Sequence, residues 1–127
     1  MLKQKIKCEN AQSLVEFALV IPIFLFLLFG IVEFGRGWET VNIVTSAARE
    51  GARVAAVTAP NISSATNAAQ RILSAGHVDN ATVSVTGPDA NREVSVTVTV
   101  NYTPMTNLIP GLGPFTITRS TSMRWEG

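Results

Sequence analysis

Few residues of this chain could carry out covalent or metal chemistry. The sequence holds one histidine, His77, and one cysteine, Cys8. One imidazole and one thiol cannot build a metal cluster, a disulfide or a Cys–His pair within a single chain. His77 lies where a helix is expected to give way to a strand, which favours a structural or solvated role. The sequence therefore predicts that the protein is not an enzyme and that it needs no cofactor or metal.

Two glycine-containing stretches and the net charge exclude two further classes of partner. Neither "GPDANRE" (87–93) nor "GLG" (111–113) lies between a strand and a helix, as a phosphate-binding loop must. The formal net charge is only +1 over 127 residues, so nothing favours a nucleic-acid partner.

Glu16 is the residue whose position most needs an explanation. It immediately precedes Phe17–Val32, a run of sixteen residues without a charge. A carboxylate is expensive to insert into a membrane unless something neutralises it. Glu16 is therefore either a tolerated charge at the membrane edge or a working part of the protein.

The apolar run predicts a transmembrane helix. Sixteen helical residues rise about 24 Å, whereas the hydrocarbon core of a bilayer is about 30 Å thick. A helix over residues 12–35 supplies the missing length and places Glu16 and Glu33 near the two interfaces, where charge costs less.

The charges before this helix predict its orientation. All three lysines, Lys3, Lys5 and Lys7, precede the run, which favours a cytoplasmic N-terminus and an outer C-terminal part. A secretory signal peptide also joins a basic start to an apolar core, but no small-x-small cleavage site follows here. We therefore expect a single-pass protein of the inner or cytoplasmic membrane that contacts lipid, with a periplasmic or extracellular C-terminal domain.

The helix is predicted to continue over residues 36–59 until Pro60 stops it. Small apolar residues recur there at three- and four-residue spacing: Val41, Val44, Ala48, Gly51 or Ala52, and Ala55. Such a stripe permits close packing. It either meets only the chain's own sheet or also packs on neighbouring copies.

The remaining sequence predicts a small domain with a second helix and a sheet. A short helix is expected in "SSATNAAQRILSAG", with Ser63 or Ser64 as its cap and Gly76 as its end. Beyond it, alternating Val and Ser/Thr residues predict two strands, and "PFTITRSTSMRW" predicts a third. In the second strand the alternation places Val94, Val96, Val98, Val100 and Tyr102 on one face and Ser and Thr on the other. The Pro- and Gly-rich "TPMTNLIPGLGP" predicts a surface loop.

The predicted fold class is α+β, with a long N-terminal transmembrane helix, a short second helix and a three-stranded antiparallel sheet. We divide the chain into four parts: a basic leader (1–11), the membrane helix (12–35), its outer continuation (36–59) and a small αβ domain (60–127).

Three segments in this order resemble one protein family. "AQSLVEFALVIP", "GIVEFGR" and "TSAAREGARVAA" resemble the TadE-like proteins, pilin-like components of tight-adherence (type IVb, Flp-type) pilus systems. The resemblance covers about residues 11–57, and the C-terminal sheet carries no matching motif. It implies a minor pilin or pseudopilin that acts as a structural or assembly subunit of such a pilus or of a related secretion system.

The resemblance also implies a processing site. Type IV prepilins have a short basic leader, a peptidase site before the apolar helix and a glutamate at the fifth mature position. Glu16 in that position makes Ala11 the last leader residue and Gln12 the first mature residue. Prepilin peptidases usually take Gly before the cut, and this chain has Ala. The alternative is a permanently membrane-anchored extracytoplasmic binding module whose leader is never cut.

The resemblance also implies that further residues act in subunit assembly. Glu16 and Phe17 would act at the entry of the helix, and Pro22 would let it bend or melt on its way into a filament. The charged residues that follow the family pattern are Glu33, Arg36, Arg49, Glu50 and Arg53; the last three form either a solvated face or pairs with neighbouring subunits. The implied partners are prepilin peptidase, other pilin-like subunits, further copies of this chain and the pilus assembly machinery.

Overall fold

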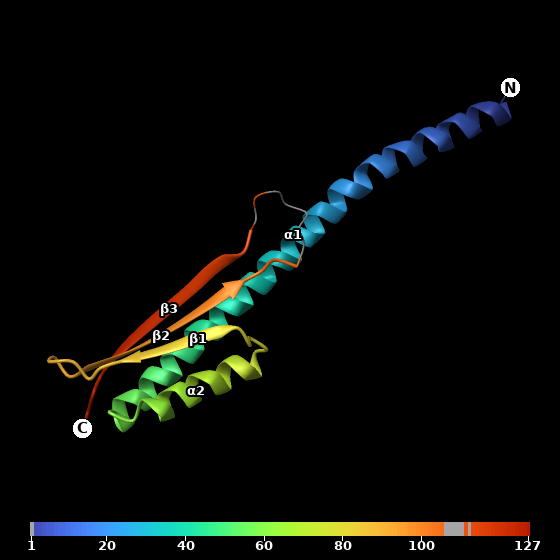
Figure 1. Ribbon diagram of the computed structural model, residues 1–127. Helices are drawn as coiled ribbons and strands as arrows, with labels where there is room; N and C mark the ends of the chain where they lie inside the picture. The colour runs from blue at the N-terminus through green and yellow to red at the C-terminus, as the bar shows by residue number, and fades with distance from the viewer. Residues whose placement is uncertain (1, 106–110, 112) are drawn as a thin grey trace. The chain divides into compact units, whose positions relative to one another are not determined.

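The computed structural model describes residues 2–105, 111 and 113–127, and side chains from residue 8 onward. The chain divides into two compact units, Met1–Gly35 and Arg36–Gly127, called here the N-terminal unit and the C-terminal unit. The elements in chain order are α1 (Leu2–Thr58), α2 (Ile62–Ala75), β1 (Ala81–Thr86), β2 (Glu93–Tyr102) and β3 (Phe115–Arg124) (Figure 1). This is the predicted α+β fold with a long helix, a short helix and three strands.

In the N-terminal unit, the described residues form helix α1, which is uninterrupted at Pro22. A proline there removes one backbone hydrogen bond, to the carbonyl of Ala18. In the C-terminal unit α1 continues to Thr58, just before Pro60, as predicted.

The sheet is antiparallel, in the order β1-β2-β3. The central strand β2 pairs Val98 with Val83 of β1 and with Arg119 of β3. Alternate residues of β2 are buried, namely Val94, Val96, Val98, Val100 and Tyr102. The alternating Val and Ser/Thr pattern therefore predicted both the strand and its inner face correctly.

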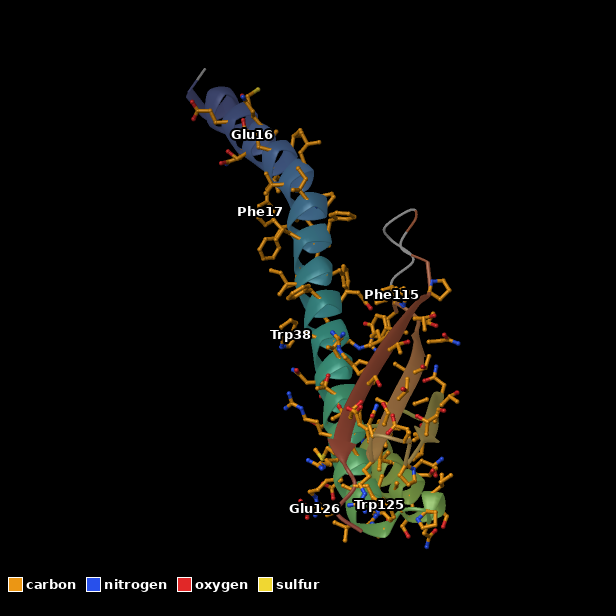
Figure 2. All side chains as sticks on the ribbon, turned by 90° about the vertical axis from the view of Figure 1, so that its left-hand side faces the viewer. Glu16, Phe17, Trp38, Phe115, Trp125 and Glu126 are labelled. Carbon is orange, nitrogen blue, oxygen red and sulfur yellow. The ribbon has the colours of Figure 1, made fainter. Side chains whose placement is uncertain are left out.

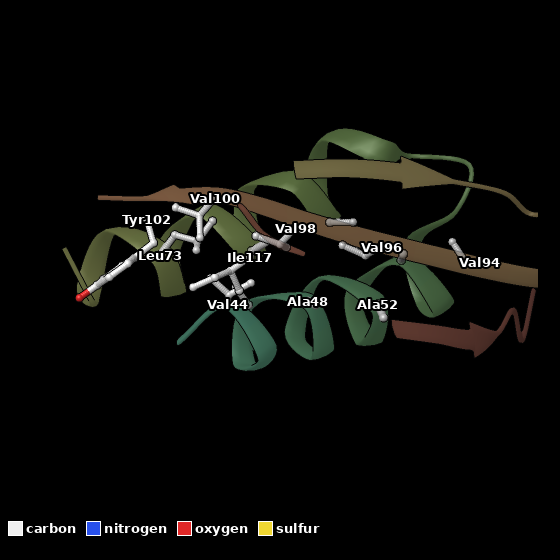
Figure 3. Close-up of a cluster of buried hydrophobic side chains, with 14 residues drawn as sticks. Val44, Ala48, Ala52, Leu73, Val94, Val96, Val98, Val100, Tyr102 and Ile117 are labelled. Atoms are coloured by element: carbon white, nitrogen blue, oxygen red, sulfur yellow. The ribbon is translucent and has the colours of Figure 1, made fainter. Parts of the chain in front are cut away.

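The core of the C-terminal unit consists mainly of valine and alanine. Side chains of β2 point toward Val44, Ala48 and Ala52 of α1, with Leu73 of α2 and Ile117 of β3 beside them (Figure 3). Val44, Ala48 and Ala52 are completely buried. Most of the small-residue stripe of α1 thus packs inside its own unit, while Val41 at its start is partly exposed.

Helix α2 begins one residue before the predicted cap. Asn61 is the N-cap residue, and the helix starts at Ile62. The prediction of Ser63 or Ser64 as the cap is wrong, because both lie inside the helix and the Ser63 hydroxyl contacts Asn61 Oδ1 at 2.6 Å. Gly76 ends the helix as predicted, with its N–H donating to the Ile72 carbonyl at 3.1 Å.

The outer face of the sheet carries neutral hydroxyl side chains that contact one another across strands. Thr97 and Ser120 hydroxyls are 3.0 Å apart, and the Ser122 hydroxyl donates to Ser95 at 3.1 Å. Half of the predicted surface loop between β2 and β3 lies outside the described residues.

Candidate functional site

The most unusual surface of the described chain is the apolar exterior of α1 in the N-terminal unit. Large apolar side chains are exposed there along the whole run: Leu14, Val15, Phe17, Leu19, Val20, Ile21, Ile23, Phe24, Leu25, Phe26, Leu27, Leu28, Phe29, Ile31, Val32 and Phe34. Because consecutive residues of a helix point in different directions, this surface surrounds the helix on every side. We call it the apolar sleeve.

An apolar surface of this extent requires a cover. A helix that is apolar all round is stable only where lipid or other helices surround it. Helix α1 is long and apolar enough to cross a membrane, and none of its most apolar window is buried by the chain itself. The sleeve therefore fits a membrane anchor.

Glu16 lies at the N-terminal end of the sleeve. Four residues separate it from Gln12, so the two lie about 6 Å apart along the helix axis and on the same side. Glu16 and Phe17 are both exposed and project outward from α1 (Figure 2). Glu16 forms no ion pair with any residue that the structure describes.

The predicted processing site lies within the same helix. Ala11 and Gln12 are exposed residues inside α1, which begins at Leu2. One turn earlier the helix carries a second exposed carboxylate, Glu9, whose backbone carbonyl accepts a hydrogen bond from the Ser13 hydroxyl at 3.0 Å. At the other end of the sleeve Glu33 is buried, with 8% of its surface exposed.

The charged residues of α1 beyond the sleeve are partly paired within the chain. The Arg53 guanidinium donates to both carboxylate oxygens of Glu50, from Nε at 3.0 Å and from Nη2 at 2.7 Å. This hydrogen bond lowers the pKa of Glu50 below its usual value; burial opposes it, and the positive charges of Arg53 and Arg71 add to the lowering. Arg49 is exposed, one turn before Arg53 on the same helix.

Two hollows of the C-terminal unit are lined by described residues. One hollow of about 410 Å³ lies at the end of the sheet and is open to solvent, between Asn91, Glu93 and Ser122 to Arg124. A second, lined partly by Arg53, Val57 and Glu126, is also open. Among the described residues no three His, Cys, Asp or Glu side chains gather so as to hold a metal ion.

Sequence reasoning overlooked Trp38. It is 62% exposed on α1, four residues after Phe34, whereas the chain's other tryptophan, Trp125, is half-buried at the end of β3. The sequence could have indicated Trp38, because it is a large amphipathic aromatic residue just beyond the apolar run.

In this chain a membrane-anchor-like helix continues into a small α+β unit. Residues 11–53 match the family model of the TadE-like proteins, and this match confirms the family resemblance predicted from the sequence. The matched stretch lies entirely within α1 and includes every predicted site residue. The match relates the chain to proteins of Tad pili and implies association with pilus components.

The other two comparisons add no relative. Neither the curated proteins nor the solved structures contain a match to the chain.

Proposed function

We propose that this chain is a membrane-anchored minor pilin or assembly subunit of a type IVb (Flp/Tad) pilus or of a related secretion machine. The observation that carries the proposal is the apolar sleeve with Glu16 at its entry, in a segment that matches the TadE-like family. The sleeve lies in the bilayer before assembly and against the helices of other subunits afterwards. The N-terminus is cytoplasmic, and the C-terminal unit lies outside the membrane.

Processing supplies the partner that Glu16 lacks within the described chain. A prepilin peptidase cuts between Ala11 and Gln12 and leaves a new ammonium group on Gln12. Glu16 lies one helical turn from that group and pairs with the ammonium of its own chain or of an adjacent subunit. Between packed helices the effective dielectric constant is low, so this pairing offsets much of the cost of removing both charges from water.

The mechanism is self-association, without covalent chemistry by this chain. Only helices in the correct register bring Glu16 and a neighbouring ammonium together. This pairing therefore favours one axial offset between neighbouring subunits. The outer charged residues, Arg49, Glu50 and Arg53, lie in the C-terminal unit and are available to contact other pilus components.

The first test removes the carboxylate of Glu16. In cells with a complete pilus system, Glu16→Ala should insert into the membrane and fold its C-terminal unit, yet be absent from sheared pili. The amount in the pilus fraction, relative to the membrane fraction, measures the effect. We expect a loss of tenfold or more, because one buried ammonium would remain unpaired at about 3 kcal/mol or more.

Glu9→Ala is the matched control. Glu9 is an exposed carboxylate two helical turns before Glu16, on the same side of α1, and it is removed with the leader. Its loss should leave incorporation unchanged. Normal incorporation of Glu16→Ala would eliminate the proposed role.

The second test concerns the leader. Co-expression with a prepilin peptidase should yield a mature chain that begins at Gln12, as seen by intact mass. Ala11→Gly should increase the processed fraction and Ala11→Leu should abolish it. A native chain that keeps its lysine-bearing leader while it resides in pili would overturn the processing step.

One observation favours a second candidate function. Ala11 stands where prepilin peptidases usually take Gly. A chain whose leader is never cut would be a permanently membrane-anchored binding module, with the C-terminal unit as its ligand-binding part. The mass measurement above separates this function from the first.

A further inference from the structure

Trp38 is a large exposed side chain in an otherwise polar part of α1. It lies in the C-terminal unit, between the partly exposed Arg36 and the exposed Glu39. The preceding residue, Gly37, faces the core, where an added Cβ would lie 4.0 Å from the Tyr102 ring. Trp38 itself projects outward from the helix (Figure 2). Most of the Trp38 surface therefore lies outside the packed core of its unit.

The chemistry of the indole ring explains it. Tryptophan combines a broad apolar ring with one N–H donor, and it concentrates where hydrocarbon meets the polar headgroups of a bilayer. In the sequence, Trp38 follows the last residue of the apolar sleeve by four positions, among the first charged residues after it. This is the place of an interfacial aromatic anchor.

The C-terminal unit supplies a contrast within the same molecule. Trp125 lies near the end of α1, since the next residue donates its backbone N–H to the carbonyl of Ala56 at 3.2 Å. Arg92 stands over the Trp125 ring, 6.0 Å from its centre. Trp125 thus belongs to the packing at the far end of the unit, eighteen helical residues from the level of Trp38.

We propose that Trp38 binds the membrane–water interface on the side of the C-terminal unit and thereby fixes the depth at which α1 sits in the bilayer. The partner is the headgroup and upper acyl-chain region of the lipid. The inference rests on the proposed membrane anchoring, which it refines by naming the residue that sets insertion depth.

Depth-dependent quenching of tryptophan fluorescence tests the proposal. The full chain is reconstituted into phosphatidylcholine vesicles whose acyl chains carry bromine either near the headgroup or near the bilayer centre. Trp125→Phe leaves Trp38 as the only emitter, and Trp38→Phe leaves Trp125. Trp38 should be quenched at least twofold more by the shallow bromines than by the deep ones, with emission shifted to the blue. Trp125 should be quenched by neither.

A third emitter separates this inference from the membrane anchoring itself. Phe26→Trp, in a chain that carries Trp38→Phe and Trp125→Phe, reports on the middle of the sleeve. Quenching of that emitter by the deep bromines, without shallow quenching of Trp38, would refute the anchor and leave the span intact. A Phe26→Trp emitter that neither lipid quenches would refute both.

The depth claim has its own measurement. In the Phe26→Trp chain with Trp125→Phe, Trp38→Ala should change the ratio of deep to shallow quenching, whereas Trp38→Phe, which keeps an aromatic ring at the interface, should change it less. Equal ratios for Trp38→Ala and Trp38→Phe would show that residue 38 does not fix the depth.

Discussion

The two units of this molecule use the same helix in opposite ways. Up to Gly35, α1 displays large apolar side chains on every side, and the chain itself covers few of them. From Arg36 onward the buried apolar residues of α1 are valine and alanine, and Val44, Ala48 and Ala52 are completely buried in the core shared with the sheet and α2. The apolar side chains are thus small where the chain's own elements pack closely and large where the chain leaves them exposed.

Glycine shows the same difference between the two units. A Cβ atom added at Gly51 would lie 3.0 Å from Val96 Cγ1 and 3.3 Å from the Ala69 Cβ, so Gly51 lets α1 meet both β2 and α2. At Gly30, no described atom lies within 4 Å of such a Cβ. The C-terminal unit is therefore close-packed by its own chain, and its stability should depend little on the sleeve.

The largest expected effect comes from a charge placed in the core of the C-terminal unit. Val96 is completely buried, so Val96→Asp leaves an unpaired carboxylate there and should cost more than about 4 kcal/mol of unfolding free energy. We expect the unit to be unfolded at 25 °C, as circular dichroism and protease digestion of the full chain in detergent would reveal.

Val57→Asp is the matched control, because Val57 is 73% exposed in the same unit. Its effect should stay within about 0.5 kcal/mol of zero. If the Val96→Asp chain and the unaltered chain had the same melting temperature, Val96 would not lie in the core as assigned.

A smaller effect is expected from overpacking at Gly51. Gly51→Leu should destabilise the C-terminal unit by about 1–3 kcal/mol, since the added atoms meet Val96 and Ala69 in a dense interface. Gly51→Ala should be closer to neutral, because the close contacts of one Cβ oppose the gain of about 1 kcal/mol in helix propensity.

Gly30→Leu is the corresponding change in the N-terminal unit and should leave the unfolding of the C-terminal unit unchanged. Thermal melts of the three variants in detergent check this order. If Gly30→Leu destabilised the unit as much as Gly51→Leu, the two regions would not differ in packing as described.

Periodicity predicted most of the architecture, because it reflects burial directly. Helical spacing predicted α1 and α2, and alternation predicted β2 with Val94 to Tyr102 on its inner face. The small-residue stripe of α1 was also recognised in the sequence, but its spacing alone does not reveal which surface it packs against. The Gly51 contact with α2 escaped prediction because it depends on how two helices approach in space.

The predictions that failed or were missed concern single side chains. The cap of α2 was assigned to serine, whereas Asn61 occupies that position. The partner of Arg53 was left open, and the structure places it one helical turn away at Glu50. Local hydrogen bonds of this kind depend on rotamers and helix boundaries, which residue patterns define only to within one or two positions.

The smallest expected effect is on the pH dependence of stability, and it concerns a carboxylate in each unit, Glu50 and Glu16. Glu50 has its cation within the chain, whereas Glu16 has none among the described residues. Because the pKa of folded Glu50 is lowered, its ionised form stabilises the fold above the usual glutamate pKa. That contribution disappears as the pH falls from the usual value through the lower value of the folded chain. It should be small, since the Arg53 and Glu50 side chains are 64% and 35% exposed.

Arg53→Gln should raise the pKa of Glu50 toward its usual value in a carboxyl NMR titration, and Arg49→Gln should not. An unchanged Glu50 pKa in Arg53→Gln would show that the pairing with Arg53 does not lower the pKa of Glu50.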